Sequence, residues 1–347
     1  MARKYRWRNG RNSGGPPIVL TCVSIEAVTE PLRERRLVRG LVWGATALWG
    51  AWALGRLTGA DRIPFLDALT IPLVSLTPYM AAFSPVPVAA ALVSRNRRAA
   101  LTAGAVVIAF GFAVLPRAIA DDQPPAHGPA LKVMSANLMF GRASYPEVVE
   151  LVRAERVDVL SVQEFTPDAR NGLAEAGLHA LLPYEVVDAR WGAEGSGVYS
   201  RHPLTALPPL PGTVMALPRA SLTLDGRTVE ITAVHPLPPI NGPQRADWDH
   251  VLRTLPRPSK GVTSILAGDF NATLDHARLR SLLHSGYRDA ADTRGKGLTP
   301  SWGVTMFGPP LTLDHILVPE NVAVRSYRVT PLEGTDHRPV ITALTLP

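Results

Sequence analysis

The segment Ser264–Asn271 reads SILAGDFN, an apolar run that ends in polar residues. Val262–Ala267 is aliphatic and is predicted to form a buried strand. Asp269 and Asn271 are two residues apart, so in an extended segment both side chains point to the same side. A charge beside a buried strand is costly unless a metal, a partner or a ligand meets it. The segment therefore predicts a polar site at a strand end, although an Asx-type turn would also explain it.

Five further motifs repeat this arrangement, each placing a polar side chain at the end or start of an apolar run. In chain order they are SANLMFG with Asn137, VLSVQEF with Glu164, ITAVHP with His235, TLDHILV with Asp314 and His315, and GTDHRPV with Asp336 and His337. The runs Val157–Val162 and Val229–Val234 are predicted to be buried strands. Several strands that each bring a carboxylate, an amide or an imidazole to one end build a single polar centre. This layout is typical of a hydrolytic active site.

Strand and helix patterns alternate from residue 131 onward. Further strands are predicted at Leu131–Asn137, Leu313–Val318, Val322–Val329 and Val340–Leu346, and helices at Tyr145–Glu155, Gly242–Leu255 and His276–Leu283. Ser144 and Asp275 are expected to be the N-caps of the first and the last of these helices. The alternation alone predicts an α/β or α+β domain.

The positive charge of the chain is confined to its N-terminal third. The formal net charge is +7, but residues 1–120 hold 15 Lys and Arg against 5 Asp and Glu, whereas residues 121–347 hold 21 against 24. The C-terminal part is therefore not expected to grip nucleic acid through a strongly basic face. Cys22 is the only cysteine, which excludes an intrachain disulfide.

Three apolar runs, at about 37–55, 63–94 and 99–117, follow a basic tail at 1–36. A bilayer-spanning helix needs about 20 mostly apolar residues, and the missing amphipathic stripe argues against helices buried in a soluble domain. The second run contains five prolines and must be kinked or partly interfacial. The prediction is about three transmembrane helices in residues 37–120, followed by a Pro-rich linker at 121–130.

Arginines flank these runs asymmetrically. They precede the first run and lie between the second and the third, at Arg33, Arg35, Arg36, Arg39, Arg95, Arg97 and Arg98. By the positive-inside rule, the N-terminus and the loop at Arg95–Arg98 are cytoplasmic. Three crossings then place residues 131–347 outside the cytoplasm. The expectation is a multi-pass cell-membrane protein whose partner is the lipid bilayer, with no obligate protein partner evident.

The ordered motifs resemble the endonuclease/exonuclease/phosphatase superfamily, and the phrases HPLPP, GDFNAT and LDHILV resemble its bacterial membrane-anchored branch. The resemblance covers about 130–347. It implies a four-layer α/β sandwich of two mostly antiparallel sheets flanked by helices. It also implies a hydrolase that uses Mg²⁺ or Mn²⁺ to cleave phosphoester bonds. Asn137, Glu164 and Asp336 are the residues that the resemblance assigns to the metal.

The resemblance likewise assigns the catalytic residues. Asp269 would activate the attacking water and Asn271 would hold a phosphate oxygen. His337 would contact phosphate or act as the base, and His235 would serve the phosphate or the leaving group. Asp314 is expected to orient a catalytic histidine, as carboxylates commonly fix an imidazole tautomer.

Several residues keep two interpretations. His315 is either catalytic or structural, and Tyr199 and Arg201 either frame the phosphate pocket or pack in the fold. The pairs Asp249–His250 and Asp275–His276 are predicted to be surface features, because one lies inside an amphipathic helix and the other at a helix start.

The leading function is a membrane-anchored, nuclease-like phosphoesterase whose substrate is a nucleic acid, a phospholipid or a small phosphodiester. One alternative is sphingomyelinase-like, phospholipase C-like or phosphoinositide phosphatase activity on lipids. Another is a non-catalytic membrane scaffold with a degenerate fold, but such a scaffold would lack Glu164, Asp269 or His337, and all three are present. A serine hydrolase is disfavoured because the chain has no G-x-S-x-G elbow.

Overall fold

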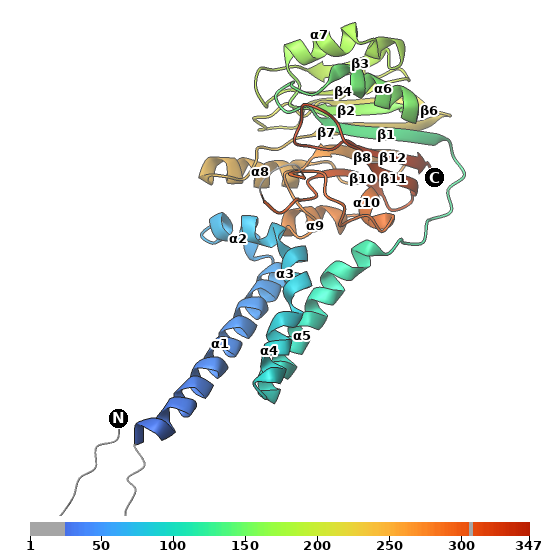
Figure 1. The fold of residues 1–347 in the computed structure, drawn as a ribbon. Helices are drawn as coiled ribbons and strands as arrows, with labels where there is room; N and C mark the ends of the chain where they lie inside the picture. The colour runs from blue at the N-terminus through green and yellow to red at the C-terminus, as the bar shows by residue number, and fades with distance from the viewer. Residues whose placement is uncertain (1–24, 305–307) are drawn as a thin grey trace, which may run out of the picture.

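The structure, a computed structural model, describes residues 25–304 and 308–347. Two six-stranded sheets lie face to face and rest on a helical stem, residues 25–118 (Figure 1). The first sheet has the order β11 (Ala323–Val329), β12 (Val340–Thr345), β1 (Ala130–Asn137), β2 (Val159–Gln163), β4 (Ser196–Ser200), β3 (Tyr184–Asp188). The second has the order β5 (Thr205–Ala206), β6 (Arg219–Leu224), β7 (Arg227–Val234), β8 (Val262–Asp269), β10 (Asp314–Pro319), β9 (Tyr287–Asp289).

Each sheet has one parallel pair at its centre, β1 with β2 and β7 with β8, and its other pairs are antiparallel. The strands predicted from the apolar runs are all present. Strands β3, β4, β5, β6 and β9 were not predicted. Strand β6 alternates polar and apolar residues as Arg-Ala-Ser-Leu-Thr-Leu and could have been found from that pattern, whereas the others have five residues or fewer. The parallel pairs determine where the polar strand-end residues gather, since the carboxyl ends of parallel neighbours meet at one edge of a sheet.

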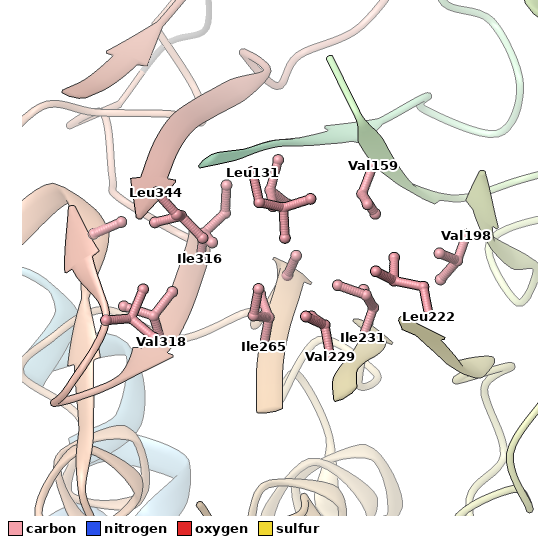
Figure 2. Close-up of a cluster of buried hydrophobic side chains, with 14 of the residues drawn as sticks. Leu131, Val159, Val198, Leu222, Val229, Ile231, Ile265, Ile316, Val318 and Leu344 are labelled. Carbon is pink, nitrogen blue, oxygen red and sulfur yellow. The ribbon is translucent and has the colours of Figure 1, made fainter. Parts of the chain in front are cut away.

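The main core lies between the two sheets. In Figure 2, Leu131 and Val159 of the first sheet face Ile265 and Ile231 of the second, and all four side chains are buried. Burial of apolar surface contributes about 25 cal/mol per Å² removed from water. This core therefore holds the sheets, and with them the strand ends, in one relative position.

Helices cover the outer faces and complete four layers (Figure 1). On the first sheet lie α6 (Tyr145–Glu155) and α7 (Pro167–Glu175), with the short η3 (Leu178–Ala180) after them. The second sheet carries α8 (Gly242–Thr254), α9 (Ala277–Leu283) and α10 (Ala290–Thr293). Ser144 is the N-cap of α6, as predicted. The predicted cap Asp275 is wrong: His276 is the N-cap of α9, because the Asp275 carboxylate is bound elsewhere.

The stem contains α1 (Ile25–Thr58), η1 (Ala60–Arg62), α2 (Asp67–Ser75), α3 (Thr77–Phe83), α4 (Pro85–Val93), α5 (Arg97–Val114) and η2 (Leu115–Ala118). Two helical segments, Arg33–Thr58 and Arg97–Ala118, are long and apolar enough to cross a membrane. The pair Asp67–Ser75 and Thr77–Val93 is bent by 62°, in agreement with the kink expected from its prolines, and adds a third candidate if the bent pair counts as one span. Helix α1 begins well before the first apolar run, whereas Cys22 and most of the basic tail lie outside the described residues.

Buried polar contacts join the stem to the sandwich. Arg117 donates to both carboxylate oxygens of Asp275, at 2.7 and 2.6 Å, and Arg56 donates to the same group at 3.0 Å. The neighbouring ring of His276 bonds through Nε2 to the carbonyl oxygen of Ile71 in α2, at 3.1 Å. The prediction that Asp275–His276 is a surface pair is therefore wrong, because both side chains are buried beneath the stem.

The linker is packed against the sandwich along its length. The amide of Asp121 donates to the carbonyl of Thr293, and Gln123 accepts from the amide of Val324. Gly128 donates to the carbonyl of Leu346 before β1 begins. The linker is thus an extended strap that connects the end of α5 to the first sheet.

Candidate active site

Four of the predicted polar residues lie at the carboxyl ends of the two parallel strand pairs. Asn137 is the last residue of β1, and Glu164 follows β2 directly. In the second sheet, His235 follows β7 and Asp269 ends β8. Because the sheets pack face to face, these ends converge on one point between them.

Asn137 connects the two sheets at this point. Its amide Nδ2 donates to Glu164 Oε1 at 3.2 Å and to Asp269 Oδ2 at 3.1 Å. Its Oδ1 accepts from the amide of Met139 at 2.9 Å, which fixes the orientation of the side chain. The two carboxylates are thereby held around one nitrogen atom.

Burial makes both carboxylates unusual. It raises the pKa of Glu164, and the nearby charge of Asp269 raises it further, against hydrogen bonds from Asn137 and from the amide of Phe140. Burial likewise raises the pKa of Asp269, whose Oδ1 accepts from the amide of Asn271 at 2.8 Å. Glu164 also has a left-handed backbone with φ of 52°, which is uncommon outside glycine and turns the chain sharply after β2. Such strained positions are frequent at functional sites.

Two histidines lie near Asp269 Oδ2, and their surroundings shift their pKa values in opposite directions. His235 Nε2 lies 3.8 Å from this oxygen and 4.0 Å from Glu164 Oε1, and burial lowers the pKa of its ring. His337 Nε2 lies 3.6 Å from the same oxygen, and its Nδ1 donates to Asp314 Oδ2 at 2.8 Å. Burial alone would lower the pKa of His337, but the charges of Asp314 and Asp269 outweigh it and raise the pKa to about 10. At neutral pH, His337 is a cation beside a neutral His235.

Strand alternation separates Asp314 from His315. Successive side chains of a strand point to opposite faces, so Asp314 faces the site while His315 faces the α-helical layer. His315 is fully buried, with Nδ1 bonded to Asp289 and Nε2 to the carbonyl of Ala272, each at 2.8 Å. Because both of its ring nitrogens are engaged, His315 has a structural role.

The remaining predicted residues lie around this centre. Asn271 has a left-handed backbone. Its side-chain Nδ2 donates to the carbonyl of Pro236 at 3.0 Å, which ties the turn after β8 to the turn after β7. The carboxylate of Asp336 accepts from the indole of Trp302 at 2.9 Å. Trp302 was not predicted as a site residue. The bond that holds it connects residues 34 positions apart, which no local pattern reveals.

Tyr199 and Arg201 belong to the packing of the first sheet. Tyr199 is buried against Phe165 beneath α7, and Arg201 makes an ion pair of 3.1 Å with Asp158. Neither lines the cavity at the site.

A cavity of about 590 Å³ opens over the centre. Glu164, His235, Asp269, Asn271, Asp336 and His337 line its polar side. Its opposite wall comes from helix α2 through Ala68, Ile71 and Pro72. The sequence did not reveal this wall, because α2 belongs to the apolar N-terminal region, nearly 200 residues from the motif around Asp269.

The donor set suits a magnesium-type ion better than a zinc-type one. Among the described residues, no three His, Cys, Asp or Glu side chains converge at metal-ligand distances. Mg²⁺ needs no such cage, since one or two carboxylates together with waters and substrate oxygens complete its shell. Glu164, which is half-buried, and Asp269, which is buried, place two carboxylates around one point, and a cation there would relieve the repulsion between them.

Comparisons with solved structures agree with this fold. An endonuclease/exonuclease/phosphatase from Beutenbergia cavernae is 20% identical with a TM-score of 0.50, covering 62% of this chain and 72% of that one. A 3′ phosphatase from Neisseria, bound to a product DNA hairpin, is 17% identical with a TM-score of 0.49 and coverage of 61% and 98%. TDP2 from D. rerio, complexed with a single-strand DNA product, is 17% identical with a TM-score of 0.48 and coverage of 62% and 98%.

The comparison with curated proteins finds no significant match. The comparison with family models finds one. The matched segment, residues 134–337, contains the first five motifs, the last motif as far as His337, and the whole carboxylate–histidine centre. With this match over more than half of its length, the chain belongs to the endonuclease/exonuclease/phosphatase family.

Proposed function

We propose that this protein is a membrane-anchored, divalent-metal-dependent phosphoesterase that hydrolyses phosphodiester or phosphomonoester bonds by attack of water. The observation that carries this proposal is the convergence of Glu164 and Asp269 on one amide nitrogen of Asn137, with one neutral and one cationic histidine beside them. Phosphoryl transfer requires positioning and charge stabilisation more than covalent chemistry, and this centre offers both.

Glu164 is the main residue assigned to the Mg²⁺ or Mn²⁺ ion, with Asn137 and Asp336 as the other two. The bound ion would supply positive charge that stabilises the phosphoryl oxygens. Asn137 donates to Glu164 in the structure and so holds that carboxylate in place, while Asp336 is held by Trp302.

The other side chains of the centre act on the attacking water and on the phosphate. Asp269 accepts the proton of the attacking water, and burial raises the pKa of its carboxyl, which makes the carboxylate a stronger base. The cationic ring of His337, oriented by Asp314, contacts a phosphate oxygen. His235 serves the phosphate or the leaving group, and Asn271 holds a phosphate oxygen. Fixed donors of this kind stabilise charge as it develops in the transition state.

The stem provides the anchor. Large apolar side chains on its helices are exposed, among them Leu37, Leu41, Leu48, Leu101, Ile108 and Phe112. Large apolar surfaces on a protein mark contact with a partner or a membrane, and two or three helices of the stem have the length and composition to cross one. The protein is accordingly assigned to the cell membrane, with its catalytic domain outside the cytoplasm.

Metal dependence tests this function directly. The full chain in detergent should hydrolyse bis(4-nitrophenyl) phosphate with Mg²⁺ or Mn²⁺, lose activity in excess chelator, and regain it when metal is restored. Glu164→Gln should weaken Mn²⁺ binding, measured by calorimetry, by at least about tenfold, because second-shell changes alone often cost that much.

Glu150→Gln is the matched control, since Glu150 is an exposed residue of α6 paired with Arg153. Its metal affinity and activity should equal those of the wild type. Full activity in excess chelator would falsify the metal mechanism.

A further inference from the structure

The wall of the active-site cavity that α2 provides is apolar, and this affects which substrates fit. Among the described residues that line the cavity, none is a lysine or an arginine. Nucleic acids bind mainly through neutralisation of many phosphates by such side chains. The cavity instead pairs a compact polar centre with an apolar face, which suits one phosphoester group attached to a hydrocarbon.

A second cavity, of about 520 Å³, lies between the stem and the sandwich. Phe110, Val114 and Leu115 of the stem line one side, and Leu274, Leu298 and Leu311 of the sandwich line the other. This volume lies within the range of about 300–1,000 Å³ typical of pockets for small molecules. Arg117 and Asp275 are the only charged residues among its described lining, and they are bonded to each other.

The two cavities adjoin each other. Ser75, at the end of α2, and Leu311, in the loop before β10, line both. The cavity over the carboxylate–histidine centre therefore lies next to the cavity beside α3 and α5, with Ser75 and Leu311 between them. Phe83 of α3 and Phe112 of α5 are exposed on the outside of these helices, where the proposed bilayer would lie.

We infer that the substrate is a membrane lipid whose phosphoester occupies the carboxylate–histidine centre while its hydrocarbon chain lies in the cavity between α3, α5 and the sandwich. This inference rests on the proposed phosphoesterase function and deepens it by naming the substrate class. The stem then has a second role besides anchoring, because it forms half of the lipid-binding surface.

Gly111 offers a direct way to fill the chain cavity. It lines the cavity from α5, and a Cβ added there would meet only Leu115 Cδ1, at 3.6 Å. Gly111→Phe therefore places a ring in the space without a backbone clash, and replacing glycine inside a helix favours the helix. Gly104→Phe is the matched control, since Gly104 lies on the same helix, outside the cavity lining, with nothing within 4 Å of an added Cβ.

The test compares 4-nitrophenyl hexadecyl phosphate with 4-nitrophenyl ethyl phosphate, using the full chain in nanodiscs with Mn²⁺. The wild type should have a kcat/KM at least about tenfold higher for the long-chain ester, because each buried methylene is favourable. Gly111→Phe should lower this long-to-short ratio at least about tenfold. Gly104→Phe should leave the ratio unchanged, which separates binding in the cavity from simple partition of the long ester into the nanodisc.

The outcomes distinguish the two proposals. Equal turnover of both esters, or a ratio that Gly111→Phe leaves intact, overturns the lipid inference while the phosphoesterase function stands. A single-stranded oligonucleotide cleaved faster than either ester also overturns it, in favour of nucleic acid. If the protein hydrolyses neither ester and does not cleave the oligonucleotide, the proposed function is overturned, and the lipid inference with it.

Discussion

At the scale of single residues, the two histidines of the centre differ because different charges surround them. Burial without a close ionic hydrogen bond lowers the pKa of His235, whereas Asp314 at 2.8 Å raises the pKa of His337 to about 10. Because its pKa is raised to about 10, the ring of His337 is protonated at neutral pH and cannot accept a proton there. This favours Asp269 as the base and His337 as the phosphate contact.

Substitution of these two residues tests that division of work. Asp269→Asn and His337→Ala should each lower kcat at least roughly a hundredfold, because acid–base groups and charge clamps each contribute about that much or more. Residues that act as a unit are strongly non-additive, so the double variant should be far less impaired than the product of the two effects. Steady-state kinetics with a chromogenic diester, together with thermal unfolding of each variant, provide the measurement.

His250→Ala is the control for the Asp269 and His337 variants. The ring of His250 is half-buried on α8 and bonds to the carbonyl of Pro211, away from the centre. A kcat loss in this variant as large as in Asp269→Asn would contradict the choice of catalytic residues. His276 is unsuitable as a control, because it is buried and lines the active-site cavity.

At the scale of elements, the turn before α9 is the joint between stem and sandwich. Asp275 accepts from Arg117 of η2 and Arg56 of α1, so one carboxylate ties together three elements that are far apart in sequence. A buried ion pair is costly to assemble, but removal of one partner leaves a buried charge unpaired. This turn is therefore the most sensitive contact of the joint.

Asp275→Asn should lower the free energy of unfolding by about 3–5 kcal/mol, the usual cost of breaking a buried ion pair. Asp249→Asn is the matched control: Asp249 pairs with Arg253 and Arg278 in a more exposed setting, where such pairs contribute about 0–1 kcal/mol. Denaturant unfolding in detergent measures both. Equal stability of the two variants would mean that the joint does not depend on this charge.

The same residue predicts a dependence on pH. Burial would raise the pKa of Asp275, but the hydrogen bond and charge of Arg117 outweigh it and hold the pKa below the ordinary 3.8. The contribution of the Asp275 carboxylate to the free energy of unfolding is therefore complete above pH 3.8. It is lost as the pH falls through the lower pKa that Asp275 has in the folded protein. The stability gap between wild type and Asp275→Asn should narrow below that pH. A gap that instead narrows between pH 5 and 8 would contradict this assignment.

At the scale of the whole molecule, the direction of the stem decides where the active site faces. Helices α1 and α5 both run towards the sandwich, and α3 with α4 runs back (Figure 1). With α1, the pair α3–α4 and α5 running in alternating directions, the N-terminal end of α1 and the sandwich lie at opposite ends of the stem. The arginines at Arg33–Arg39 and Arg95–Arg98 lie at the end away from the sandwich, which favours a cytoplasmic position for that end.

A topology reporter checks this arrangement. A phosphatase reporter that works only outside the cytoplasm should be active when fused after Asp122 and silent when fused at Arg97. The reverse pattern would place the catalytic domain in the cytosol. A green fluorescent reporter that folds only in the cytoplasm, fused at the same two positions, should give the complementary result.

The sequence alone predicted seven of the twelve strands in the part of the chain that the structure describes, and the polar residues at their ends, which the structure brings together at one point. Buried strands such as Val229–Val234 and Val262–Ala267 are encoded by their own aliphatic runs, and the polar residue at each strand end is part of the same local segment. The ordered motifs therefore predicted the fold and the candidate centre. The kinked second apolar run followed from its own prolines in the same way.

Only the tertiary structure decided what these residues meet. His276 and Asp275 are polar residues beside a helix start, a pattern typical of a surface, yet the stem covers both. The neutral state of His235 depends on its burial, and the cationic state of His337 depends on Asp314 and Asp269 from two strands. The apolar wall of the candidate site comes from α2. These features arise from contacts between residues up to about 200 positions apart, and the pairing of such distant segments is set by packing of the whole chain rather than by any local pattern.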